Sequence, residues 1–250
     1  NCNTTGATNT AVGKCALKTN TEGANNVAIG SEALCKNTTA GSNTAVGGRS
    51  LFTSTTGACQ TALGNNAMKR TTTGGSSAAV GYFALCANTT GSFNTAVGIC
   101  AGCTNTTGSN IVAIGRNAQP SSATVSDEFT LGDANITSLR CADTSISTLS
   151  DLRDKKNVED IPHGLDYILA LRPVKFDWNT RDGTRIDKKD YGFIAQELDK
   201  VEETFGNREY TRLVSKENPD KWEADPMKTY PILIKAIQEL TKRIKDLEDK

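Results

Sequence analysis

Small and apolar residues recur through the first half of the chain with a fixed period of 17 residues. Each period holds an Ala, an aliphatic residue and a Gly in succession, and a Thr-rich segment with a second Gly lies between successive triplets. Seventeen residues are too few for a helical hairpin or a propeller blade, so each period is expected to form one coil of a β-solenoid. The Gly residues that close the triplets are Gly13, Gly30, Gly47, Gly64, Gly81, Gly98 and Gly115.

Each triplet predicts a short strand, and each Thr-Thr-Gly segment predicts a turn. Successive strand residues point to opposite faces, so the Ala residues share one face and the Val, Ile or Leu residues share the other. One face can fill the narrow core of the coil, whereas the other stays apolar and needs a cover. A neighbouring copy of the chain is the economical cover, so the pattern predicts an oligomer.

The period is predicted to fail after Ala118, where Gln119-Pro120 marks a break. Beyond the break, a neck of short strands is expected at Phe129–Gly132, Ile136–Leu139 and Ile146–Leu149.

After residue 149 the pattern changes to short strands alternating with helices. The alternation of apolar and polar residues at Pro173–Trp178 predicts a half-buried strand. Asn179–Asp190 predicts a polar turn region, and Tyr191–Leu198 holds strand residues followed by helix formers.

The last stretch carries apolar residues at alternating spacings of three and four, which is the a/d seam of a coiled coil. A seam of roughly two and a half heptads is marginal for an isolated helix, so it is expected to pack against partners. Ile at a with Leu at d favours dimers in isolated coiled coils, a weak preference that an attached trimeric solenoid would override. After Tyr230, the trimer seam comprises Leu233, Ile237, Leu240, Ile244 and Leu247.

Composition divides the chain at the same place. Residues 1–149 hold 18 of the 22 Gly and all 8 Cys, with 8 Lys+Arg against 6 Asp+Glu (net +2). Residues 150–250 hold 20 Lys+Arg against 22 Asp+Glu (net −2) and no Cys. We therefore predict three regions: an all-β solenoid (1–118), a β neck (119–149) and an α+β domain ending in a coiled-coil helix (150–250).

These values argue against several classes of function. Neither half is basic enough to indicate a nucleic-acid partner. No apolar run approaches the roughly 20 residues of a membrane span. Because Asn1 falls inside a repeat, without an initiator Met or signal peptide, we expect the chain to be the C-terminal part of a longer one.

The Cys residues are scattered through the repeat and are expected to be small apolar filler in a reducing compartment. Cys100 and Cys103 have the CxxC spacing, but no second pair or nearby His completes a zinc site, so we predict no metal and no cofactor. The Asn-x-Ser/Thr sequences come mostly from the repeat and are expected to be turn residues.

The 17-residue pattern resembles the head repeats of trimeric autotransporter adhesins and of some phage fibres, which form a trimeric left-handed β-roll. The usual repeat in those families is shorter than 17 residues. A stiff spacer and a receptor-binding surface are equally open interpretations of this region.

Three ordered motifs of the second half resemble the C-terminal intramolecular chaperone of phage tailspikes, endosialidases and neck appendages. They are Leu149–Lys155 (Leu-Ser-Asp-x-Arg-x-Lys), Gly192–Glu197 and Pro231–Leu240. The resemblance implies a domain that trimerises, helps the preceding fibre to fold and then cuts itself off. The family's cleavage falls immediately before the Ser and uses a Ser/Lys dyad, so it implies a scissile Leu149–Ser150 bond with Ser150 and Lys155 as the catalytic pair.

A Ser hydroxyl needs a base to become a nucleophile, and a desolvated Lys can serve. Ser150 and Lys155 are five residues apart, which points their side chains to opposite faces of a strand and about 140° apart on a helix. A turn, or a Lys from an adjacent chain, must bring them together. Asp151 and Arg153 are expected to orient or pair rather than to transfer protons. From spacing alone, a helix cap followed by a solvated charge run is the favoured interpretation.

Taken together, these features predict a homotrimeric, phage-type tail fibre of the virion with a single-turnover, self-cleaving C-terminal domain. A host-cell receptor or glycan is a candidate partner beside the chain itself. One rival is a purely structural or receptor-binding fibre that retains its C-terminal trimer clamp. A bacterial trimeric adhesin is disfavoured because no membrane-anchoring barrel strands close the chain.

Overall fold

A computed structural model describes residues 3–136, 138–140, 150–181, 183, 185–220 and 222–249. The chain divides into two compact units, Asn1–Thr137 and Ser138–Lys250. The predicted fold class is confirmed, because the first unit is a β-solenoid and the second an α+β region that ends in a helix.

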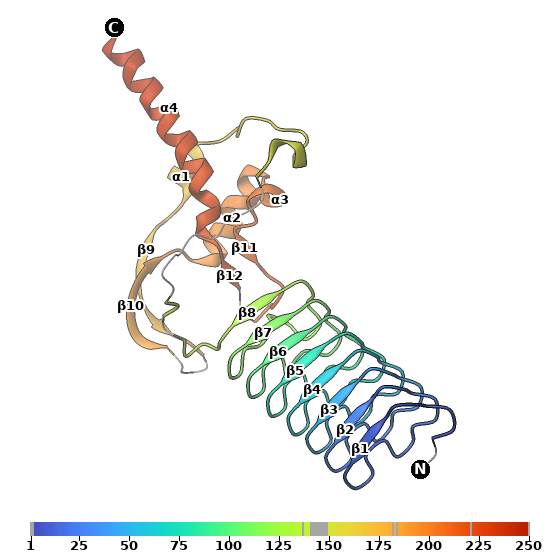
Figure 1. Ribbon diagram of the computed structural model, residues 1–250. Coiled ribbons are helices and arrows are strands. Elements are labelled where there is room, and N and C mark those ends of the chain that lie inside the picture. The colour runs from blue at the N-terminus through green and yellow to red at the C-terminus, as the bar shows by residue number, and fades with distance from the viewer. Residues whose placement is uncertain are drawn as a thin grey trace. The chain divides into compact units, whose positions relative to one another are not determined.

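The solenoid is built on one parallel sheet of eight strands in sequence order (Figure 1). Each strand pairs with the residues 17 positions further on, as Ala28 does with Ala45, so the sequence period is also the register. The strands are β1 (Thr10–Val12), β2 (Val27–Ile29), β3 (Thr44–Val46), β4 (Thr61–Leu63), β5 (Ala78–Val80), β6 (Thr95–Val97), β7 (Val112–Ile114) and β8 (Phe129–Leu131).

The two faces of the strands differ as predicted. The central Ala residues of β2 to β7 are fully buried, and they pack with a second interior column that the sequence analysis did not identify: Leu17, Leu34, Leu51, Met68 and Leu85. The third strand residues face outward, and seven of them are 37–57% exposed: Val12, Ile29, Leu63, Val80, Val97, Ile114 and Leu131.

The period does not fail after Ala118, contrary to the sequence-based expectation. Phe129 and Leu131 of β8 pair with Val112 and Ile114 of β7 in the same register as every earlier coil. The intervening segment differs from the repeat in composition but has the same length. Stacking of the strands requires only that the length be kept. Ile136, Ser138 and Leu139 lie in no strand, and the predicted strand Ile146–Leu149 falls outside the described residues.

Glycine recurs because successive coils approach each other closely at the ends of the strands. Gly30 has φ +134°, and a Cβ there would lie 2.6 Å from the carbonyl carbon and oxygen of Gly47. Glycine is the only residue type that adopts this backbone conformation readily and also fits so little space.

Columns of buried Asn side chains link the coils from inside. The Asn37 side-chain amide donates to Asn20 Oδ1 at 2.6 Å and to the Ala40 carbonyl at 3.0 Å. In a second column, Asn26 Oδ1 accepts from the Asn43 backbone N–H at 3.0 Å. Three of the Asn-x-Ser/Thr sites stand in the first column and are fully buried: Asn37, Asn88 and Asn105. Asn is therefore explained at these sites by structure, because its side-chain amide donates a hydrogen bond to a buried backbone carbonyl.

The second unit combines short helices, two hairpins and the long C-terminal helix α4 (Figure 1). Its elements are the 3-10 helix η1 (Leu152–Asp154), α1 (Leu165–Ala170), β9 (Val174–Asn179), β10 (Ile186–Gly192), α2 (Ala195–Phe205), α3 (Arg208–Thr211), β11 (Val214–Ser215), β12 (Glu223–Ala224), the 3-10 helix η2 (Pro226–Thr229) and α4 (Tyr230–Glu248).

The core of this unit gathers residues that are far apart in sequence. Tyr167, Leu198, Leu213 and Ile232 form one buried cluster, contributed by α1, α2, the segment before β11 and α4.

The predicted strand at Pro173–Trp178 and the predicted C-terminal helix are present as β9 and α4. The predicted turn region Asn179–Asp190 is wrong in its second half, because β10 begins at Ile186 and pairs antiparallel with β9. Most residues of β10 are polar and exposed, so their pattern did not indicate a strand.

Candidate functional site: a serine and a lysine on a single turn

The segment that follows residue 149 forms one tight turn. The Asp154 N–H donates to the Asp151 carbonyl at 3.1 Å, and the Lys155 N–H donates to the Leu152 carbonyl at 3.1 Å. Asp151 and Lys155, on either side of η1, are both extended. A turn between two extended residues reverses the chain and brings the residue after it back toward the residue before it.

The turn brings together the two residues of the predicted dyad. Lys155 Nζ donates a hydrogen bond to Ser150 Oγ across 2.8 Å within one chain. The five-residue gap that regular structure cannot close is thus closed locally, without a lysine from another chain. Leu149, on the other side of the predicted scissile bond, lies outside the described residues.

The pair is open to water. Ser150 and Lys155 are both exposed, as are the apolar residues Leu152 and Val158, at 72% and 64%.

Asp151 and Arg153 pair with each other. Asp151 Oδ1 accepts the Arg153 backbone N–H at 2.9 Å, and its carboxylate also accepts the guanidinium, with Nη2 2.6 Å from Oδ2. These hydrogen bonds from Arg153 lower the pKa of Asp151, and the carboxylate raises the pKa of Arg153. Neither side chain is hydrogen-bonded to Ser150 or Lys155 in any contact between described residues. The cap predicted for this segment is therefore Asp151, one residue after Ser150.

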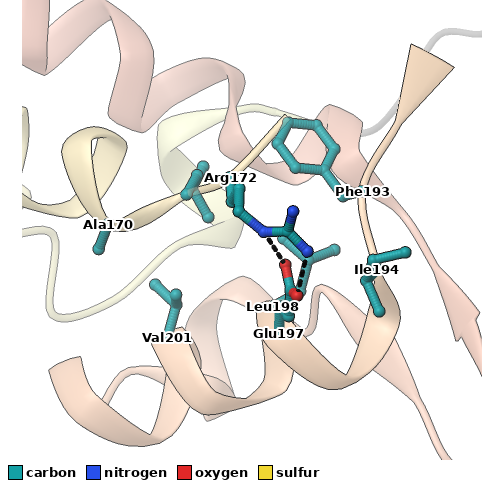
Figure 2. Close-up of a pocket in the computed structure, with 8 residues that line it drawn as sticks. Ala170, Arg172, Phe193, Ile194, Glu197, Leu198 and Val201 are labelled. Carbon is teal, nitrogen blue, oxygen red and sulfur yellow. Dashed lines mark hydrogen bonds and ion pairs between the residues drawn. The ribbon is translucent and has the colours of Figure 1, made fainter. Parts of the chain in front are cut away.

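The motif Gly192–Glu197 connects β10 to α2 and lines a small pocket (Figure 2). Arg172 reaches across the pocket to Glu197, and its Nε donates to Oε2 at 2.9 Å. This pairing lowers the pKa of Glu197. The pocket encloses about 10 Å³, room for one water molecule at most. Arg172 was not identified from the sequence, because its partner is 25 residues away.

Helix α4 has two apolar faces. Ile232 and Ala236 are buried against the rest of the unit, and Glu239 anchors the helix by accepting the Leu165 N–H at 2.8 Å. The five residues predicted to form the trimer seam are instead 41–69% exposed: Leu233, Ile237, Leu240, Ile244 and Leu247. The seam is thus left uncovered in the single chain.

Two other chemically suggestive residues, His163 and Cys103, interact with groups other than Ser150 and Lys155. His163 Nδ1 lies 3.2 Å from Asp166 Oδ2, and its ring packs edge-on against Phe205. Burial, with Cys100 and Cys86 nearby, raises the pKa of the Cys103 thiol to about 11. Among the described residues, no three His, Cys, Asp or Glu side chains are grouped to hold a metal ion. No helix in that part of the chain is both long enough and apolar enough to cross a bilayer.

The segment that begins with this turn matches a known protein family. Residues 150–207 match the family described as chaperone of endosialidase, whose name also classes it among the peptidases. The match begins at Ser150 and supports the predicted C-terminal intramolecular chaperone domain. No curated protein and no solved structure matches the chain. A chaperone domain of this family behind a β-solenoid fits a fragment of a phage tail fibre or tailspike.

Proposed function

We propose that the C-terminal domain promotes trimerisation and folding of the β-solenoid and then releases itself by cutting the Leu149–Ser150 bond. Ser150 is the nucleophile and Lys155 the general base. The observation that carries the proposal is the 2.8 Å contact between Lys155 Nζ and Ser150 Oγ, at the first residue of the segment that matches the chaperone family. The assembled fibre would belong to the virion, with a host-cell receptor or glycan as the solenoid's candidate ligand.

The reaction follows from the position of Ser150 on the leaving-amine side of the bond. Lys155 takes the proton of Oγ, which attacks the Leu149 carbonyl carbon. The C–N bond breaks as the acyl group moves from nitrogen to oxygen, and the Ser150 nitrogen leaves as a protonated amine. Water then hydrolyses the ester, which gives a Leu149 carboxylate and restores the Ser150 hydroxyl. Attack by the Ser150 of another copy would balance in the same way.

The exposure of the dyad supports a link between cleavage and assembly. An ammonium group in water holds its proton at neutral pH, so a lysine serves as a base only once it is desolvated. Lys155 is exposed in the single chain, as are the apolar residues Leu152 and Val158, three residues to either side of it in sequence. Covering this surface during trimer assembly would desolvate Lys155, and the cut would then report that the fibre has folded.

Two uncovered apolar surfaces support self-association. One is the outward row of aliphatic residues along the solenoid, and the other is the trimer seam of α4. Copies of the same chain offer matching surfaces with the same repeat spacing. We expect an Ile237→Ser, Ile244→Ser variant to remain folded but to lose the trimer, as measured by analytical ultracentrifugation.

Intact mass tests the proposed cleavage. The uncut chain weighs 26.6 kDa, and the wild type should yield two products that divide between Leu149 and Ser150. Ser150→Ala and Lys155→Ala should stay whole. Lys156→Ala is the matched control, since it removes an adjacent exposed lysine and should cleave like the wild type. A wild type that stays whole as an assembled trimer would overturn the proposal.

A retained trimer clamp is the second candidate function, and the exposed apolar seam of α4 supports it without any cleavage. In that case all four proteins stay whole, and the Ile237→Ser, Ile244→Ser variant still loses the trimer. The two measurements therefore separate a self-cleaving chaperone from a purely structural fibre.

A further inference from the structure

The contact between Lys155 and Ser150 depends on a turn of only three residues. A 3-10 turn of this length has few internal hydrogen bonds, and isolated short helices are marginal in water. In the described part of the chain, the turn Leu152–Asp154 buries no residue of its own. Something other than packing must therefore keep the turn closed.

Asp151 provides two kinds of contact to the turn. Its Oδ1 accepts the Arg153 N–H at 2.9 Å, which satisfies a backbone donor at the start of the turn. Its carboxylate also holds the Arg153 guanidinium, with Nε 3.1 Å from both oxygens. The first contact is a cap, and an Asn could make it equally well. The second needs the negative charge.

We propose that Asp151 is the positioning residue of the Ser150/Lys155 pair, and that it acts as the N-cap of the turn that returns Lys155 Nζ to Ser150 Oγ. The proposal rests on the proposed cleavage reaction. Asp151 transfers no proton; it raises the fraction of molecules in which the dyad is assembled. Arg153 supplies the capped N–H through its backbone, and its side chain only holds the carboxylate in place.

Three substitutions separate the cap from the charge. Asp151→Ala removes both, and cleavage should slow by roughly fivefold to tenfold, the rate equivalent of losing a typical N-cap. Asp151→Asn keeps an oxygen that can accept the Arg153 N–H, and its rate should stay within roughly twofold of the wild type. Arg153→Gln removes the ion pair but keeps the capped N–H, and it should also stay within roughly twofold.

A second readout does not depend on cleavage. In a Ser150→Ala background the chain cannot cut itself, and millisecond hydrogen exchange reports directly on the turn. The amides of Asp154 and Lys155, which donate to Asp151 and Leu152, should exchange several-fold faster with Asp151→Ala and unchanged with Asp151→Asn. The thermal midpoint of the trimer should be the same in all variants.

The outcomes distinguish the two proposals. If the wild type never cleaves while the amides respond as expected, the proposed cleavage reaction is wrong, but Asp151 does cap the turn. If Asp151→Ala cleaves at the wild-type rate, or Asp151→Asn is as slow as Asp151→Ala, the positioning role is overturned. If Asp151→Ala alone lowers the thermal midpoint, Asp151 stabilises the fold as a whole and does not act by positioning the dyad.

Discussion

The two units of this chain bury their interiors in opposite ways. In the solenoid, each coil contacts the next through three-residue strands in the same register, small Ala side chains and hydrogen-bonded Asn columns, so every coil depends mainly on its two neighbours. In the C-terminal unit, a core of four large side chains joins segments up to 65 residues apart, from Tyr167 to Ile232. The solenoid therefore depends on the close fit of adjacent coils, whereas the second unit depends on α4 being docked.

The largest effect is expected where two solenoid backbones touch. Gly30→Ala places a Cβ 2.6 Å from the Gly47 carbonyl, at φ +134°, and should destabilise the solenoid by at least about 3 kcal/mol. Gly206→Ala is the matched substitution in the second unit, at φ +64° with nothing within 4 Å, and should cost about 1–2 kcal/mol. Denaturant unfolding followed by circular dichroism measures both. Equal costs would contradict the close-approach explanation.

The faces of α4 provide the next comparison. Ile232→Ala opens a cavity in the core and should cost about 2–5 kcal/mol in the unfolding of the C-terminal unit. Ile237→Ala, on the exposed seam, should cost under about 0.5 kcal/mol in the monomer and should weaken self-association instead. If Ile237→Ala destabilises a monomer as much as Ile232→Ala does, the seam is part of the core and not a surface for partners.

A stabilising substitution tests the Asn column. Asn37 Oδ1 is buried and has no hydrogen-bond partner among the described residues, because the equivalent residue of the next coil is Ser54 and not Asn. Ser54→Asn should supply the missing donor and stabilise the solenoid by about 1 kcal/mol in thermal unfolding. Ser31→Asn, on the exposed surface, is the control and should leave stability unchanged. If Ser54→Asn destabilises the solenoid, the coil that holds residue 54 is too narrow to continue the Asn column.

The smallest effect concerns pH. Because its folded pKa is lowered, the Asp151 carboxylate contributes at any pH above its ordinary pKa of about 3.9, and the contribution is lost as the pH falls through the lowered value. The cap should therefore be unchanged between about pH 5 and 8. Carbon-13 NMR of the Asp151 carboxyl group measures this directly, and Arg153→Gln should move the pKa back toward 3.9. An unshifted carboxyl in the wild type would contradict the pairing.

The comparison also explains how far the sequence could be interpreted. Strand positions, register and the outward aliphatic row follow from the period alone, since parallel stacking repeats every coil at equal length. The Asn columns carried a signal too, because Asn20, Asn37, Asn88 and Asn105 recur at multiples of 17, but nothing local shows that they point inward. In the second unit, β10 was missed because its residues are polar and exposed.

The dyad illustrates the same division. The types and order of Ser150 and Lys155 were visible in a motif, whereas their contact was not, because five residues of strand or helix keep such side chains apart. One short turn, capped by Asp151, brings them to 2.8 Å.

The repeating parallel coils, the amphipathic C-terminal helix and the residues of the candidate dyad could be predicted from the amino-acid sequence, because each follows a local period or motif. Which side chains stack inside the coils, which face of α4 is buried and how the chain reverses at η1 became known only from the folded chain. These features depend on where the backbone turns and what lies opposite, and contacts between residues distant in sequence leave no local pattern.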